Sequence, residues 1–254
     1  MGLVEIYAKF NIDRGSADVF ASQAQAIVAT TRKHCPDTLR CDWFFNEKQS
    51  EGIAMMVHRN DTALQQQFDA AAVNYELLLQ SADVSLQVLG QSYSSGLQQL
   101  TKQPIGMLNF AYGMQARSGI QCVARPAGRQ PTEHIEIYTH FALHPGKLDV
   151  FKRDAAALLE VVKQKDTGTS RYDWFYDDAN LTAVAADTYD DPASMFSHMR
   201  NCHEAHNKLL HHSTMVTEFL GTLPLAAMQA VAKYDPYIAP FLVGLRAYFS
   251  GGYA

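Results

Sequence analysis

Two stretches of the chain, residues 4–10 and 135–141, alternate between apolar and polar positions. The apolar positions of the first stretch are Val4, Ile6, Ala8 and Phe10, and its other positions are Glu5, Tyr7 and Lys9. The polar side of the second stretch carries Glu136, Tyr138 and His140. Because successive side chains of a strand point to opposite faces, this period of two predicts a β-strand at both places.

A helical period follows each of these strands. Residues 147–165 place Phe151, Leu158 and Val162 on one face with charges opposite, which predicts an amphipathic helix, and residues 16–33 show a weaker version. Two more strands, a second helix and a fourth strand are predicted next. In the later half the second helix begins after Asp191, a favourable N-cap residue followed by proline. The order βαββαβ is that of a ferredoxin-like unit.

The two halves of the chain repeat each other. "RCDWFFNE" at 40–47 and "RYDWFYDD" at 171–178 hold the only two tryptophans, 131 residues apart. The same offset superposes residues 4–20 on 135–151 and returns late in each half. Three blocks in one order indicate a tandem duplication. We therefore predict a first repeat at 1–113, a linker at 114–133 and a second repeat at 134–254.

A four-stranded sheet with helices on one face leaves its other face to be covered. Two similar sheets can cover each other, so we predict an α+β fold in which two ferredoxin-like repeats form an intrachain barrel with a pocket. Such a chain would be a monomer with an internal pseudo-dimer, or a homodimer through its apolar tails.

Composition narrows the partners. A net charge of −5 gives no basic surface for nucleic acid, so nucleic acid is not expected as a partner. The sequence has no run of eighteen apolar residues, so no membrane span is predicted. The start of the chain reads as a strand rather than a signal segment. The four cysteines are not matched between the repeats, which favours reduced thiols and a cytoplasmic location.

The segment "GTSRYDWFYDDANLTAVAADTYDDPASMFSHMRN", residues 168–201, resembles the antibiotic biosynthesis monooxygenase family, within the dimeric α+β barrel superfamily. The late segment "TEFLG…APF", from residue 217 to 241, resembles the tail of a quinol-monooxygenase-like subgroup. The resemblance to the family is carried by Arg171, Tyr172, Asp173, Asp187, His198 and Asn201. It implies a barrel that binds a small aromatic or quinol-like substrate. Several relatives oxygenate such compounds with O₂ and without metal or flavin, so no cofactor is expected.

The repeats differ at the positions that could do chemistry. The sequence places Val57 where the second repeat has Asp187, and the second helix of the first repeat has no histidine. We therefore expect the working pocket in the second repeat. The candidate catalytic residues are His198, Asp187 and His140, with His198 and Asp187 as a base and its orienting acid.

The candidate substrate-binding residues are Tyr138, Trp174, Asp173, Arg171 and Phe175. Each has a structural alternative. Trp43 and Trp174 occur in both repeats, which favours core packing over a direct role. Glu136 and Arg171 recur in the first repeat as Glu5 and Arg40, which favours a partly buried ion pair between adjacent strands. Asp173 could cap a turn, and Tyr138 has a copy in Tyr7. His198 could equally bond a backbone carbonyl on a packed helix.

Some histidines and cysteines of the chain have the spacing of metal ligands. His198, Cys202 and His206 follow each other at four-residue spacing on one helix face, as metal ligands can. Because no further clear ligand is evident elsewhere, an exposed helix face is favoured and no metal is predicted. Some relatives in this superfamily degrade haem, and they use a histidine of the second helix with an asparagine on the first strand and a tryptophan near the end of the third strand. Here Asn11 lies in the first repeat and neither tryptophan is on a third strand, so haem chemistry is disfavoured.

Two functions from different classes fit this sequence. The first is a cofactor-independent monooxygenase that acts on a quinol-like or polycyclic phenolic compound. The second is a non-catalytic binding or regulatory barrel that kept the fold and lost the chemistry. An isomerase or decarboxylase with the same acid–base pocket is a third possibility, which substrate loss without oxygen uptake would reveal.

Overall fold

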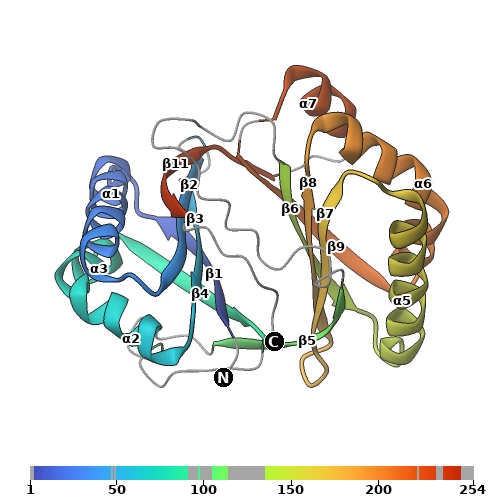
Figure 1. The fold of residues 1–254 in the computed structure, drawn as a ribbon, viewed down its shortest axis with the longest axis horizontal. Helices are drawn as coiled ribbons and strands as arrows, with labels where there is room; N and C mark the ends of the chain where they lie inside the picture. The colour runs from blue at the N-terminus through green and yellow to red at the C-terminus, as the bar shows by residue number, and fades with distance from the viewer. Residues whose placement is uncertain are drawn as a thin grey trace. The chain divides into compact units, whose positions relative to one another are not determined.

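The computed structural model describes residues 3–46, 48, 50–90, 97, 105–113, 135–221, 223–232 and 237–246. These residues divide into two compact units, and each unit is described by itself (Figure 1). Unit 1 takes its described residues from 3–108 and 239–246, and unit 2 from 109–113 and 135–238. The predicted linker, residues 114–133, lies outside the described part of the chain.

Unit 1 has the predicted βαββαβ order, with its second helix divided in two. Its elements are β1 (Val4–Ile12), α1 (Ala17–His34), β2 (Thr38–Asn46), β3 (Glu51–His58), α2 (Asp61–Ala70), α3 (Ala72–Leu79) and β4 (Ala82–Leu89). The antiparallel strand order is β4-β1-β3-β2. The helices lie against one face of this sheet, where the predicted apolar side of β1 joins the core.

Unit 2 repeats this arrangement. Its elements are β6 (Ile135–Leu143), α5 (Leu148–Lys165), β7 (Thr169–Asp177), β8 (Thr182–Tyr189), α6 (Pro192–Leu210), β9 (Ser213–Leu220), α7 (Leu225–Val231) and β10 (Tyr237–Ala239). The strand order is β10-β9-β6-β8-β7. Helices α5 and α6 pack side by side on one face (Figure 1). The predicted α+β class with two ferredoxin-like halves is therefore confirmed.

The segment after each repeat adds a strand to a sheet. β11 (Phe241–Arg246) pairs antiparallel with β2 in unit 1, although it follows the second repeat. β5 (Gly106–Gly113) follows the first repeat. Its first residues pair with β4, and its last residues, from Asn109 on, pair with β7. The compact units and the sequence repeats therefore end at different places.

The tryptophan of each repeat is the centre of an aromatic cluster. Trp43 stacks on Phe10 at 5.4 Å between ring centroids and meets Phe20 edge-on at 5.8 Å. Trp174 stacks on Phe141 at 5.5 Å and meets Phe151 edge-on at 6.0 Å. Both tryptophans are fully buried. Packing between the first strand, the first helix and the second strand is thus one reason why both repeats contain the same string.

None of the described helices combines the length and the apolar character that a membrane crossing needs.

Candidate functional site

A cavity of about 340 Å³ lies within unit 2, between one face of the sheet and helix α6. Its lining is mostly apolar and includes Ile137, Phe141, Trp174, Met195, Met199 and Phe219. The polar side chains on it include those of Asp187, Tyr189, His198 and His206. An apolar cavity with a few converging polar groups is typical of small-molecule sites.

Helix α6 carries His198 to this cavity. Asp191 caps the helix, since its Oδ1 accepts a 2.7 Å hydrogen bond from the backbone N–H of Ser194, and proline occupies the first helical position. The side chains that α6 buries are Met195, His198, Cys202 and Leu209, at spacings of three, four and seven residues. The sequence thus places His198 on the sheet-facing side by helical period alone.

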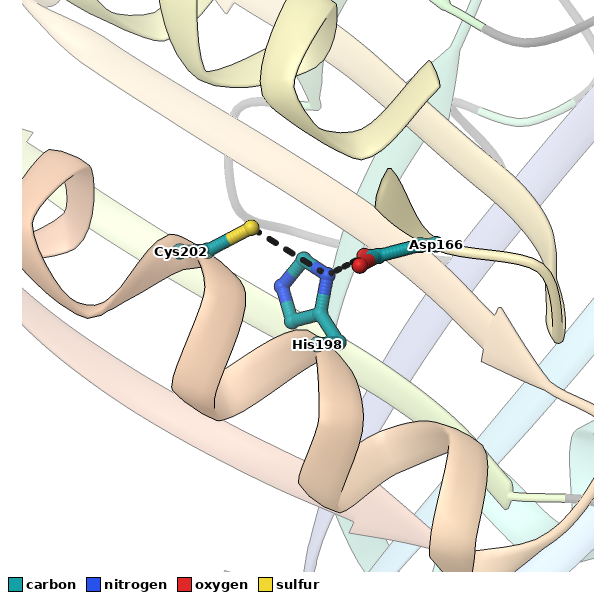
Figure 2. Close-up of side chains that lie close together, drawn as sticks. All are labelled: Asp166, His198 and Cys202. Carbon is teal, nitrogen blue, oxygen red and sulfur yellow. Dashed lines mark hydrogen bonds and ion pairs between the residues drawn. The ribbon is translucent and has the colours of Figure 1, made fainter. Parts of the chain in front are cut away.

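His198 is bonded to a carboxylate. Its Nδ1 lies 2.6 Å from Oδ2 of Asp166, the residue that follows α5, and both side chains are at most 3% exposed. In Figure 2 the second ring nitrogen, Nε2, lies on the side of the ring away from Asp166. An ionised carboxylate can only accept, so Nδ1 carries the hydrogen, and in the neutral form of the imidazole Nε2 then holds the lone pair. Nε2 is buried and has no hydrogen-bond partner among the described residues.

Asp166 is itself held in place. Nδ2 of Asn201 donates to Oδ1 of Asp166 at 2.7 Å, and Oγ1 of Thr169 donates to Oδ2 at 3.4 Å. Desolvation acts to raise the pKa of Asp166, but the hydrogen bonds from His198 and Asn201 outweigh it and lower this pKa. The carboxylate is therefore ionised beside the imidazole, which is the arrangement that orients a general base.

Asp187 is a second buried acid on the cavity. It projects from β8, and its Oδ2 accepts a 3.3 Å hydrogen bond from the hydroxyl of Tyr189. Burial raises the pKa of Asp187 to about 7, although the bond from Tyr189, and His198 whenever its imidazole is protonated, act against the shift. Its Oδ1 has no partner among the described residues. Near neutral pH this carboxyl is partly protonated and can donate a hydrogen bond.

The acid bonded to His198 is thus Asp166 and not Asp187, the partner that the sequence predicts. Nothing in the family pattern pointed to Asp166. One feature of the sequence indicates it: Asp166 is the C-cap of α5, where the helix dipole disfavours a negative charge. An acid at this position is therefore expected to have a hydrogen-bond donor or a cation beside it. In the first repeat the same offset gives Cys35.

The predicted substrate-binding residues lie on two different faces of the sheet. Trp174 lines the cavity, and its Nε1 is buried without a hydrogen-bond partner among the described residues. The other four, Tyr138, Arg171, Asp173 and Phe175, are not in the cavity lining. They alternate with cavity-lining residues along β6 and β7, so their side chains point to the opposite face.

On that opposite face Arg171 donates from Nε to Asp173 Oδ2 at 2.7 Å and from its guanidinium to the hydroxyl of Tyr138 at 3.2 Å. His140, the third predicted catalytic residue, lies 3.3 Å from Oε2 of Glu218 through its Nε2. His140 also points away from the cavity, since its neighbours Thr139 and Phe141 line it. The structure therefore does not bring His140 to His198.

Unit 1 has a different polar set at the equivalent positions. The register pairs Ile6 with Met56 and Ile137 with Asp187, so the counterpart of Asp187 is Met56, and the assignment of Val57 is wrong by one residue. The position of His198 on α6 is taken on α2 by Gln67. Gln67 is fully buried and donates to Oγ1 of Thr31 at 3.0 Å. Among the residues described for unit 1, these counterparts form no acid–imidazole pair.

Comparison of the sequence with protein-family models and with curated proteins gives no match. Solved structures do match. One, from Fusobacterium nucleatum and described as a "putative monooxygenase", has a TM-score of 0.61 at 11% identity and covers 85% of this chain and 90% of its own. Another with the same description, from Lactobacillus acidophilus, has a TM-score of 0.55 at 8% identity and covers 85% and 92%. The resemblance to such monooxygenases that the sequence predicts is thereby confirmed for the fold.

Proposed function

We propose that the protein is a cofactor-independent monooxygenase that oxidises a quinol-like or polycyclic phenolic compound in the cavity of unit 2. The observation that carries the proposal is the buried Asp166–His198 pair at the wall of an apolar cavity. An aromatic substrate binds in an apolar pocket. Its reaction with O₂ needs a base that removes a proton and leaves an electron-rich anion.

His198 is the proposed base. Its Nδ1–H is bonded to Asp166, so Nε2 is the atom that accepts the substrate proton, and the imidazolium formed is stabilised by the adjacent carboxylate. Asp166 acts through His198 and is a positioning residue. Because the pair is nearly excluded from water, the attraction between imidazolium and carboxylate is stronger than it would be at the surface.

Besides Nε2 of His198, two polar atoms of the described cavity lining that lack a hydrogen-bond partner are proposed to hold the substrate. The Nε1–H of Trp174 and the carboxyl of Asp187, while protonated, can each donate to a substrate oxygen. An oxygen that gains negative charge on deprotonation would be stabilised by such donors. In this proposal the residues on the opposite face of the sheet have a structural role; they are Tyr138, Arg171, Asp173 and Phe175.

The reaction balances without a cofactor. In an anthrone-type phenolic substrate, a CH₂ group between aromatic rings loses a proton to His198, and the carbanion supplies the electrons that form a C–O bond with O₂. The peroxide takes up the proton, and loss of one water molecule leaves a carbonyl. The substrate is oxidised, one oxygen atom of O₂ enters the product and the other leaves as water.

The test is oxygen uptake by the purified protein with a panel of hydroquinones and anthrone-type phenols. Uptake above the buffer rate that is lost in His198→Ala supports the proposal. If no compound raises oxygen uptake but some bind in the cavity, the protein is a binding barrel without chemistry. That alternative is favoured by the 2% exposure of His198, which is low for a group that must reach its substrate.

A further inference from the structure

Three different metal-binding side chains meet beside helix α6. The ligand atoms of Asp166, His198 and Cys202 all lie within 4.8 Å of one another. Sγ of Cys202 is 3.7 Å from Nδ1 of His198, and the same Nδ1 is 2.6 Å from Oδ2 of Asp166 (Figure 2). The four-residue spacing of His198 and Cys202 was evident in the sequence, but Asp166 is brought to them only by the packing of α5 against α6.

The two separations at Nδ1 suit a cation with tetrahedral coordination, and the separation between the ligand atoms of Asp166 and Cys202 is at most 4.8 Å. Ligand distances of about 2.0–2.3 Å from zinc place neighbouring ligand atoms roughly 3.3–3.7 Å apart. The Sγ–Nδ1 distance of 3.7 Å has this length already. The Nδ1–Oδ2 contact of 2.6 Å is a hydrogen bond, and it would have to lengthen by less than about 1 Å when a cation replaces the shared hydrogen.

The surroundings of the cluster also suit a divalent cation. All three side chains are buried, and one carboxylate and one thiolate would neutralise a charge of +2. Asn201 bonds Oδ1 of Asp166 and leaves Oδ2 directed at the imidazole, as a residue behind a ligand does in metal sites. The second buried acid, Asp187, adds to the negative potential at Cys202.

We propose that Asp166, His198 and Cys202 form a binding site for a divalent cation of the zinc type. Cysteine sulfur and imidazole nitrogen favour Zn²⁺ or Co²⁺ over Mg²⁺ and Ca²⁺. On binding, the thiol of Cys202 releases its proton to solvent, and the imidazole hydrogen moves from Nδ1 to Nε2. Water fills the fourth position.

This site does not depend on the proposed oxidation chemistry, and it would oppose that chemistry. With a cation on Nδ1, the hydrogen on Nε2 removes the lone pair that a general base needs. Zinc is therefore expected to inhibit the proposed activity.

The test uses Co²⁺, because its absorption reports the ligands without any enzyme assay. The reduced, metal-free protein is titrated with Co²⁺ under nitrogen. The expected spectrum has a thiolate-to-cobalt charge-transfer band in the near ultraviolet and the visible bands of tetrahedral Co²⁺, and one equivalent of Zn²⁺ abolishes both. A titration that yields no such bands at millimolar Co²⁺ overturns the proposal.

Variants assign the ligands. Cys202→Ser should remove the charge-transfer band, and Asp166→Asn should weaken Co²⁺ binding by at least about 10-fold. The matched control is Cys41→Ser, because Cys41 is equally buried in unit 1 and burial raises the thiol pKa of both Cys41 and Cys202 to about 12. A band that survives in Cys202→Ser or disappears in Cys41→Ser contradicts the assignment.

Discussion

Asp166 and His198, which are 32 residues apart in the sequence, share a 2.6 Å hydrogen bond between two nearly water-excluded side chains. The bond fixes which imidazole nitrogen is free.

Asp166→Asn offers an amide in place of the carboxylate, so the imidazolium is no longer stabilised. We expect kcat for oxygen uptake to fall about 100-fold or more, with a smaller change in KM. Asp178→Asn is the control, since Asp178 pairs with Lys152 at the surface, and it should leave kcat unchanged.

His198→Gln copies the residue that unit 1 carries at the equivalent position. Gln67 shows that a buried glutamine fits this place on the second helix when a hydroxyl such as that of Thr31 accepts its hydrogen bond. In unit 2, Asp166 can accept instead. We expect the free energy of unfolding in urea to stay within about 1–2 kcal/mol of the wild type while oxygen uptake is lost. Retained uptake would assign the base to another residue.

Asp187 should make stability depend on pH. Its pKa is about 7 in the folded protein against an ordinary value of 3.8, so between about pH 4 and 7 the folded state binds more protons than the unfolded state. The contribution of Asp187 to stability therefore falls as pH rises through this window. Asp187→Asn removes the effect and should raise the free energy of unfolding by up to roughly 4 kcal/mol at pH 8.

At about pH 4 the same Asp187→Asn substitution should leave the free energy of unfolding nearly unchanged, because the wild-type carboxyl is then protonated in the fold. Urea unfolding at both pH values gives the comparison. An equal difference between variant and wild type at the two pH values would contradict the raised pKa.

Substitution of Asp173 distinguishes between a structural and a substrate-binding role for the face of the sheet opposite the cavity. It is 2% exposed and accepts from Arg171, so Asp173→Ala should remove the carboxylate from a charge-assisted hydrogen bond and cost about 1.5–3 kcal/mol of unfolding free energy. Asp37→Ala breaks the half-exposed pair with Arg59 and should cost about 0–1 kcal/mol. If Asp173→Ala instead keeps its stability and loses only substrate affinity, the residue binds substrate.

Gly168 sets the approach of β7 to α6 next to Asp166. A Cβ built on Gly168 would overlap the side chain of Ser194 in the first turn of α6. Gly168→Ala should therefore lower the unfolding free energy by about 1–3 kcal/mol and reduce kcat through displacement of Asp166. Ser194→Gly removes the overlap and should restore part of both in the double variant. Additive losses in the double variant would show that the overlap is not the cause.

Features of the fold that depend on local period are predictable from the residue pattern alone. Alternation along residues 135–141 gave β6 its two faces, and helical spacing put His198 and Cys202 on the buried side of α6. The offset of 131 residues between the tryptophans identified two α+β units. Each of these signals arises from neighbours within a few residues, or from a copy of them, so no tertiary contact is needed to detect it.

Which residues meet depends on long-range packing. The side of α5 that packs on α6 brings Asp166 to His198, and the strand register replaces Val57 by Met56 as the counterpart of Asp187. His140 is as plausible a catalytic residue as His198 by residue type, but its side chain lies on the face of β6 that points away from the cavity, beside Glu218. A hydrogen bond of 2.6 Å requires two elements to be docked within a fraction of an ångström. Long-range packing sets that distance, and a residue pattern contains no measure of it.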